Sequence, residues 1–223
     1  LLQREVVPAI GCTEPVAVAL CAARAAELLG SLPERVEVEL SMNVLKNAMG
    51  VGIPGTGMIG LPIAIFLGMR IGKSSYGLEV LKETDAQAVE EGKQYIEEGR
   101  ISIALDENAP DGLYIKVCAQ GDGHQTEAII CGEHTRFIYE AIDDKVLRNE
   151  TVKACADEEI DVPTLTMSKI YDFIVQVPIE EINFIEDAAT MNMAAAEQSL
   201  KTHYGHGVGV MLKGSNQSTG KST

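Results

Sequence analysis

The sequence is poor in basic residues. It has 18 Lys and Arg against 33 Asp and Glu, which gives a formal net charge of -15. Proteins bind nucleic acids and anionic membrane surfaces through basic patches, and a strongly acidic chain has few residues to form one. The acidic residues are dispersed along the chain, as on an ordinary solvated surface. We therefore expect neither a nucleic acid nor a membrane as a partner.

Paired cysteines and long apolar runs are also missing. The cysteines are odd in number, and none forms a CxxC pair or a zinc-type spacing: Cys12, Cys21, Cys118, Cys131 and Cys155. This usage is typical of a reducing cytosol and not of a disulfide scaffold. The apolar stretch 16–29 contains Arg24 and Glu27 and is too short to span a bilayer. The first residues lack the basic region of a signal peptide, so we predict a cytoplasmic protein.

The chain lacks an initiator Met, and residues 213–223 are polar without an apolar period. We expect a piece of a longer protein or a processed form. Two apparent phosphate-binding motifs are incomplete. Residues 214–222 imitate a Walker A loop but have the wrong glycine spacing, and residues 50–55 match GxGxxG without the required strand-to-helix turn. We exclude a Rossmann fold.

The hydrophobic pattern predicts an α+β fold. Residues 14–29 are apolar nearly all round, which is typical of a buried helix, and residues 36–40 alternate like a half-buried strand. A glycine-rich loop follows at 49–60, then helices at 61–69 and 85–98, the second capped by Thr84 or Asp85. Residues 101–105, 113–117, 128–131 and 137–139 predict an antiparallel meander, and 167–177 and 179–200 predict helices.

The predicted architecture is thus an antiparallel sheet with a buried N-terminal helix and C-terminal helices. We divide it into an N-terminal helix that carries a cysteine motif (1–34), an α+β domain with the glycine-rich loop (35–142), a helical segment (143–205) and a flexible tail (206–223).

Gly11-Cys12-Thr13-Glu14-Pro15 places a cysteine at the start of the buried helix. Thr13 can cap the helix, and Glu14 and Pro15 suit its first turn. The helix dipole there favours negative charge, so we expect a lowered thiol pKa for Cys12. A thiolate can act as a nucleophile or bind a metal. The alternative is a small residue packed in the core.

Asn43, Lys46 and Asn47 lie between the predicted strand and the glycine-rich loop. Their amides and ammonium group suit a small carboxylate or amine ligand, and an ordinary solvated loop is the alternative. The loop itself can offer N–H groups to an anion or form a tight structural turn. His203 and His206 are close in sequence, but no carboxylate partner accompanies them, and we favour a role without metal.

Two stretches together, residues 5–15 and 43–57, resemble the L-cysteine desulfidase family. That family is related to the iron–sulfur L-serine dehydratases (alpha chain). The resemblance covers most of this chain but only the N-terminal half of a typical member. It implies a lyase of amino-acid catabolism that eliminates sulfide from L-cysteine and gives pyruvate and ammonia. It also implies a [4Fe-4S] cluster, held by three cysteine thiolates, as the Lewis acid.

The resemblance implies site residues as well. Cys12 matches one cluster ligand, and the other two belong to a C-terminal half that this sequence lacks, so the ligand set is incomplete and we expect the fragment to be inactive alone. The substrate-binding residues that it implies are Asn43, Lys46, Asn47, Gly55 and Thr56. No catalytic acid or base is assigned.

Residues 35–140 also resemble the small α+β domain of serine dehydratases, which is akin to serine-binding domains. The alternative functions are an L-serine ammonia-lyase and a non-catalytic amino-acid-binding module. A small amino acid is the expected partner in each case, and a homodimer is compatible with all of them.

Overall fold

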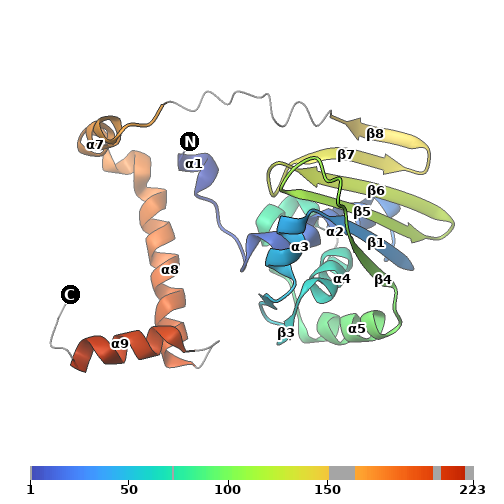
Figure 1. Cartoon of the computed structure of the whole chain (residues 1–223), viewed down its shortest axis with the longest axis horizontal. Coiled ribbons are helices and arrows are strands. Elements are labelled where there is room, and N and C mark those ends of the chain that lie inside the picture. The colour runs from blue at the N-terminus through green and yellow to red at the C-terminus, as the bar shows by residue number, and fades with distance from the viewer. Residues whose placement is uncertain (1, 72, 151–163, 203–206, 219–223) are drawn as a thin grey trace. The chain divides into compact units, whose positions relative to one another are not determined.

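A computed structural model describes residues 2–71, 73–150, 164–202 and 207–218. They fall into two compact units. The sheet unit is Pro8–Ile160, and the helical unit combines Leu1–Val7 with Asp161–Thr223. Figure 1 shows strands β4 to β8 gathered in the sheet unit and helices α7, α8 and α9 following one another in the helical unit.

The sheet unit is built on a six-stranded sheet with the order β4-β1-β5-β6-β7-β8. Its strands are β1 (Arg35–Leu40), β4 (Ile101–Leu105), β5 (Tyr114–Gly121), β6 (His124–Cys131), β7 (Phe137–Ile142) and β8 (Lys145–Asn149). Val36, Val38 and Leu40 of β1 are buried, whereas Arg35 and Glu37 are exposed, as their alternation predicts. The prediction of an α+β fold with a mainly antiparallel sheet and helices toward both ends of the chain is confirmed.

One pairing differs from the predicted meander. β4 lies beside β1 and runs parallel to it, with Val36 opposite Ile101, whereas the other neighbouring strands are antiparallel. Parallel strands need a long crossover. The helices α3 (Met42–Ala48), α4 (Leu61–Ile71) and α5 (Ala86–Glu97) lie between β1 and β4 in the chain and supply it.

Helix α2 (Thr13–Leu29) covers the sheet and packs against β5, β6 and α4. Its residues from Pro15 to Ala23 are all buried, which confirms the apolar, buried helix that the sequence predicts, and Gly30 ends it in the left-handed conformation. The Thr126 hydroxyl of β6 donates to the carbonyl of Ala25 on α2 at 2.8 Å. The helix and the sheet therefore share one core.

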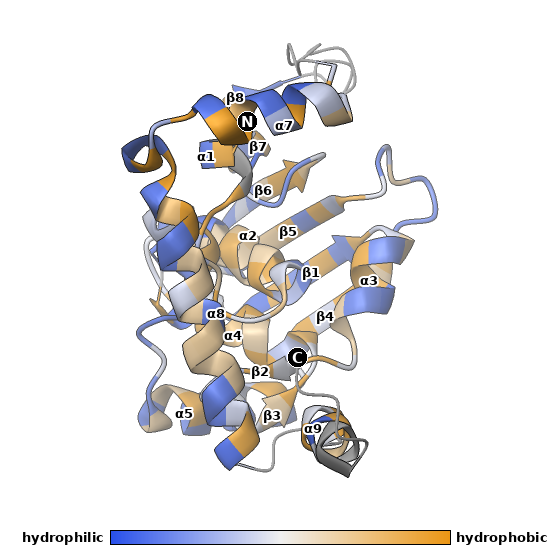
Figure 2. Ribbon diagram, turned by 90° about the vertical axis from the view of Figure 1, so that its left-hand side faces the viewer, coloured by the Kyte–Doolittle hydropathy of each residue, from blue (hydrophilic) through white to orange (hydrophobic). Residues whose placement is uncertain are grey.

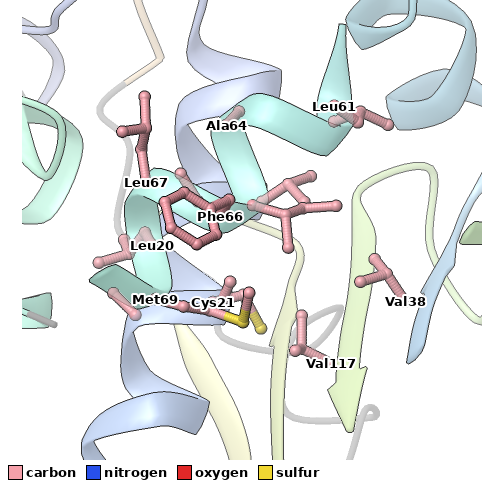
Figure 3. Packing of buried hydrophobic residues seen from close by; sticks show 14 of the residues in the cluster. Leu20, Cys21, Val38, Leu61, Ala64, Phe66, Leu67, Met69 and Val117 are labelled. Carbon is pink, nitrogen blue, oxygen red and sulfur yellow. The ribbon is translucent and has the colours of Figure 1, made fainter. Parts of the chain in front are cut away.

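The core continues into α4 and α5. Figure 3 shows Phe66 and Leu67 of α4 in one cluster with Leu20 of α2. A Cβ atom added to Gly68 of α4 would lie 2.1 Å from the carbonyl oxygen of Ala19, so the two helices cross in direct backbone contact. Helix α5 is capped by Asp85, one of the two predicted caps, whose side chain accepts from the backbone N–H of Ala88 at 2.8 Å.

Several short elements were not predicted. They are α1 (Leu2–Glu5), α3, the hairpin strands β2 (Gly52–Ile53) and β3 (Met58–Ile59) inside the glycine-rich loop, the 3₁₀ segment η1 (Ser74–Glu79) and the strand β8. All five described residues of β8 are exposed, so no apolar alternation marks this strand in the sequence.

The helical unit contains α1, α7 (Met167–Gln176), the 3₁₀ segment η2 (Ile179–Ile182), α8 (Asn183–Lys201) and α9 (Val208–Ser218). The helix predicted at 179–200 thus begins as a 3₁₀ turn, and the predicted flexible tail contains α9. Figure 2 shows hydrophobic residues among the polar ones along α7 and α8. In the described part of the chain, no helix combines the length and apolar character needed to cross a membrane.

Candidate functional site

The Cys12 motif lies at the N-terminus of α2, with Cys12 itself as the N-cap residue. The half-buried Cys12 thiol donates to Oε2 of Glu14 at 3.0 Å, and the Thr13 hydroxyl donates to the same oxygen at 3.2 Å. The prediction that Thr13 caps the helix is therefore wrong. Thr13 is the first residue of the helix and does not occupy the cap position, and its hydroxyl donates to the Glu14 carboxylate.

The other segment of the predicted site, residues 43–57, also contacts the Glu14 carboxylate. Nδ2 of Asn47 donates to Oε1 of Glu14 at 3.0 Å, across 33 positions of sequence. Asn47 lies on α3, where the sequence predicted a loop. Asn43, Lys46 and Asn47 are spaced i, i+3 and i+4 and are all exposed, so they share the solvent face of α3, while Val44 and Ala48 are buried beneath it.

The glycine-rich loop also touches the cysteine motif. Gly11 has a φ of +84°, and a Cβ atom added there would lie 3.0 Å from Cγ of Pro54. The turn before Cys12 therefore packs against the β2–β3 hairpin, and a side chain at position 11 would push the two apart. We call Cys12, Glu14, Asn47 and the adjoining Gly11–Pro54 contact the Cys12 cluster.

The other predicted substrate-binding residues are placed differently. The Thr56 hydroxyl donates to the carbonyl of Ile53 at 2.7 Å and accepts from the N–H of Met58 at 2.9 Å, so it closes the hairpin. Gly55 is exposed at the hairpin tip with a φ of +78°. Asn43 lines a cavity of about 510 Å³ together with Ser41, Asp106 and Asp111. Among the hydrogen bonds that the structure describes, Asn47 is the one of these five residues that bonds to Glu14 and so belongs to the Cys12 cluster.

The electrostatics of the cluster contradict one expectation. Burial, followed by the hydrogen bond to Glu14, raises the pKa of the Cys12 thiol, whereas the helix position alone predicted a lowered value. Hydrogen bonds from Cys12, and to a smaller extent from Asn47 and Thr13, lower the pKa of Glu14 to about 2. In this arrangement the sulfur keeps its proton and Glu14 is the anion.

The cluster supplies a single thiol. Cys21 is buried in the core and donates to the carbonyl of Ala128 at 3.2 Å, and Cys118 donates to Glu127 on the sheet at 3.5 Å. Cys155, His203 and His206 lie outside the described residues. Within the ranges that the structure describes, no three or more His, Cys, Asp or Glu side chains are grouped as a metal site. The described residues therefore do not form a complete site for an iron–sulfur cluster.

Glu14 is the central residue that the sequence analysis missed, since we assigned it only a favourable place in the first helical turn. The Cys-Thr-Glu order could have suggested a local hydrogen bond. The contact with Asn47 depends on how α3 packs beside α2, and no local pattern encodes it.

The fold and the cluster together define a class: an α+β sheet unit with a thiol–carboxylate–amide group at a helix N-terminus. Similar proteins carry the name UPF0597. The chain is 56% identical to a UPF0597 protein of Bacteroides fragilis over 214 residues, which is 96% of this chain and 50% of that protein. Identity is 50% to one from Parabacteroides distasonis, over 96% of this chain and 50% of that protein. For one from Aeromonas hydrophila it is 44%, over 95% of this chain and 48% of that protein.

The chain thus spans about half the length of the curated relatives it matches. No protein-family model matches it. No solved structure matches it either.

Proposed function

We propose that the chain contributes one half of a cytoplasmic lyase that eliminates sulfide from L-cysteine. The single observation that carries the proposal is spatial. The two stretches on which the resemblance to L-cysteine desulfidases rests meet through the hydrogen bond from Asn47 to Glu14 and the contact of Gly11 with Pro54. Segments that are separate in sequence but joined in space are what a shared site requires.

In this proposal Cys12 is a ligand of the [4Fe-4S] cluster, whose Lewis acidity would assist departure of the sulfur. The described residues provide one of the three thiols, so the chain's own part is to hold that thiol and to bind the substrate. The reaction converts L-cysteine to sulfide and 2-aminoacrylate, and water then converts 2-aminoacrylate to pyruvate and ammonia.

The exposed face of α3 is the proposed anchor for the amino acid. The Lys46 ammonium group suits the substrate carboxylate, and the neighbouring Asn43 and Asn47 amides can donate or accept hydrogen bonds. Gly55 and Thr56 shape the hairpin beside it. L-Serine would present the same carboxylate and amine, so an L-serine ammonia-lyase is the closely related alternative.

The test is anaerobic reconstitution of the protein at the full length of its relatives, followed by assays of sulfide released from L-cysteine and ammonia released from L-serine. Cys12→Ser should lose the visible absorbance of the cluster and the lyase activity. Cys118→Ser is the matched control. Its thiol is half-buried like that of Cys12, but it lies on β5 and outside the Cys12 cluster. A Cys12→Ser protein with full cluster absorbance would contradict the role given to Cys12.

A second candidate function is a non-catalytic amino-acid-binding module. The observation that favours it is the polar face of α3, which is open to solvent. The described residues of the same unit place one thiol, that of Cys12, near this face and group no three metal-binding side chains. Calorimetric titration of this chain with L-cysteine and L-serine tests it. Binding that is weakened by Lys46→Ala supports the module, and the absence of heat with both amino acids contradicts it.

A further inference from the structure

The helical unit exposes apolar side chains to an extent that sets it apart. No described residue of α7, η2 or α8 is buried. Exposed large hydrophobic residues lie on each of its longer helices, among them Met167 and Ile174 of α7, Met191 and Met193 of α8, and Met211 and Leu212 of α9.

On α7 these residues form a regular stripe. Met167, Ile170, Tyr171 and Ile174 follow the spacing i, i+3, i+4 and i+7, which places them along one face of the helix. Met167 is 80% exposed and Ile174 is 62% exposed. A stripe of this spacing is the pattern of a helix that packs against another surface, and we call these four residues the α7 stripe.

A hollow lies next to the stripe within the same unit. A cavity of about 410 Å³ is lined by Leu2 of α1, Phe173 of α7, Val177 just after α7, Ile182 at the end of η2 and Phe184 of α8. A cavity lined mainly by aliphatic and aromatic side chains suits an apolar side chain of another segment.

Helices α7 and α8 are expected to gain stability when another surface buries their exposed apolar side chains. Isolated helices of 10 to 19 residues, the lengths of α7 and α8, are marginal in water, and in proteins they gain stability by burying an apolar face. Contiguous apolar surface on a protein marks an interaction site.

The lengths of the relatives indicate the occupant. The 214 residues aligned with the Bacteroides fragilis protein include 96% of this chain, yet they are 50% of that protein. Such a relative therefore carries the counterpart of the helical unit and a comparable length of further polypeptide in one chain. A covalently linked segment has a high effective concentration, which favours it over a second copy of the chain.

We propose that the α7 stripe and the adjoining hollow are the docking surface for the further polypeptide that the longer relatives carry. The helical unit is then the part of this chain on which a second folded region is built. The proposal does not depend on the lyase activity, because it concerns packing and not the Cys12 cluster.

The test compares hydrogen exchange in two proteins: this chain, and a single longer chain that joins it to the segment of the Bacteroides fragilis relative outside the alignment, in that relative's order. Amide exchange in α7 and α8 should be slower in the longer chain by about tenfold or more, while β5 and β6 of the sheet unit exchange equally in both.

Substitutions make the comparison specific. Ile174→Asp in the longer chain should remove the added protection of α7. Val146→Asp, at a position of β8 that is 49% exposed, should leave it intact. Equal exchange of α7 in the two proteins overturns the proposal. Concentration-dependent protection of α7 in this chain alone, with a dimer in light scattering, also overturns it, because a second copy is then the occupant.

Discussion

The sheet unit and the helical unit differ in what holds them together. In the sheet unit, α2, α4 and four of the strands (β1, β2, β5 and β6) contribute to one cluster of buried residues, from Val16 of α2 to Ile130 of β6. In the helical unit, none of the described residues of α7, η2 and α8 is buried. Burial of apolar surface is the dominant favourable contribution to folding, so the sheet unit has its own source of stability and the helical unit requires another.

The largest expected effect comes from a matched pair of leucines, one in each unit. Leu20 on α2 is 1% exposed and Leu200 on α8 is 37% exposed. Leu20→Ala should lower the free energy of unfolding of this chain by about 4 kcal/mol, because it leaves a cavity, and Leu200→Ala should change it by less than about 0.5 kcal/mol. Urea denaturation followed by circular dichroism measures both. Equal losses would contradict the division between the units.

The crossing of α2 and α4 provides a second prediction. Gly68→Ala would place a methyl group 2.1 Å from the Ala19 carbonyl oxygen, so the helices must separate. We expect a loss of about 3 kcal/mol in the free energy of unfolding. Gly50→Ala is the control, since no atom lies within 4 Å of its added Cβ. A stable Gly68→Ala protein would show that the crossing can adjust without loss.

A buried ion pair gives a smaller effect. Glu140 on β7 has a side chain 8% exposed and pairs with Arg24 of α2 at 2.7 Å. Arg24→Met should cost about 2 kcal/mol in the same denaturation experiment, because the buried carboxylate loses its nearest cation. Arg35→Met removes a solvent-exposed pair with Glu37 and should cost about 0.5 kcal/mol or less. A loss for Arg24→Met as small as that control would mean that Arg148, whose Nε lies 3.7 Å from Oε1 of Glu140, is a sufficient partner for the carboxylate.

The smallest expected effect tests the link between the two motifs at the candidate site. In a double-mutant cycle, Glu14→Ala and Asn47→Ala should show a coupling free energy of about 0.5–1 kcal/mol, because each removes one end of the same hydrogen bond. The cycle of Glu14→Ala with Lys46→Ala is the control, and it should be additive. Additivity in both cycles would separate α3 from the Cys12 motif.

Much of the fold could be predicted from the sequence where an element carries its own periodicity. The apolar α2, the alternating β1 and the capped α5 were predicted within a few residues. The polar β8 is defined by pairing with β7, and the parallel alignment of β4 with β1 is a long-range choice. Neither the strand β8 nor the direction of the β4–β1 pairing leaves a pattern in the local sequence.

The candidate site divides in the same way. The place of Cys12 at a helix start follows from the Gly-Cys-Thr-Glu-Pro order. The seven-residue helix α3 contains two asparagines, which are weak helix formers, and its burial of Val44 and Ala48 depends on tertiary packing. The direction of the pKa shift of Cys12 was predicted wrongly because burial and Glu14 oppose the effect of the helix dipole.

Native-state hydrogen exchange of this chain alone tests the central difference most directly. Amides of β5 and β6 should exchange only through global unfolding, and those of α7 and α8 should exchange at least about a thousandfold faster through local opening. Protection of α8 equal to that of β6 would contradict the account, because the helical unit would then be stable without any cover for its apolar surface.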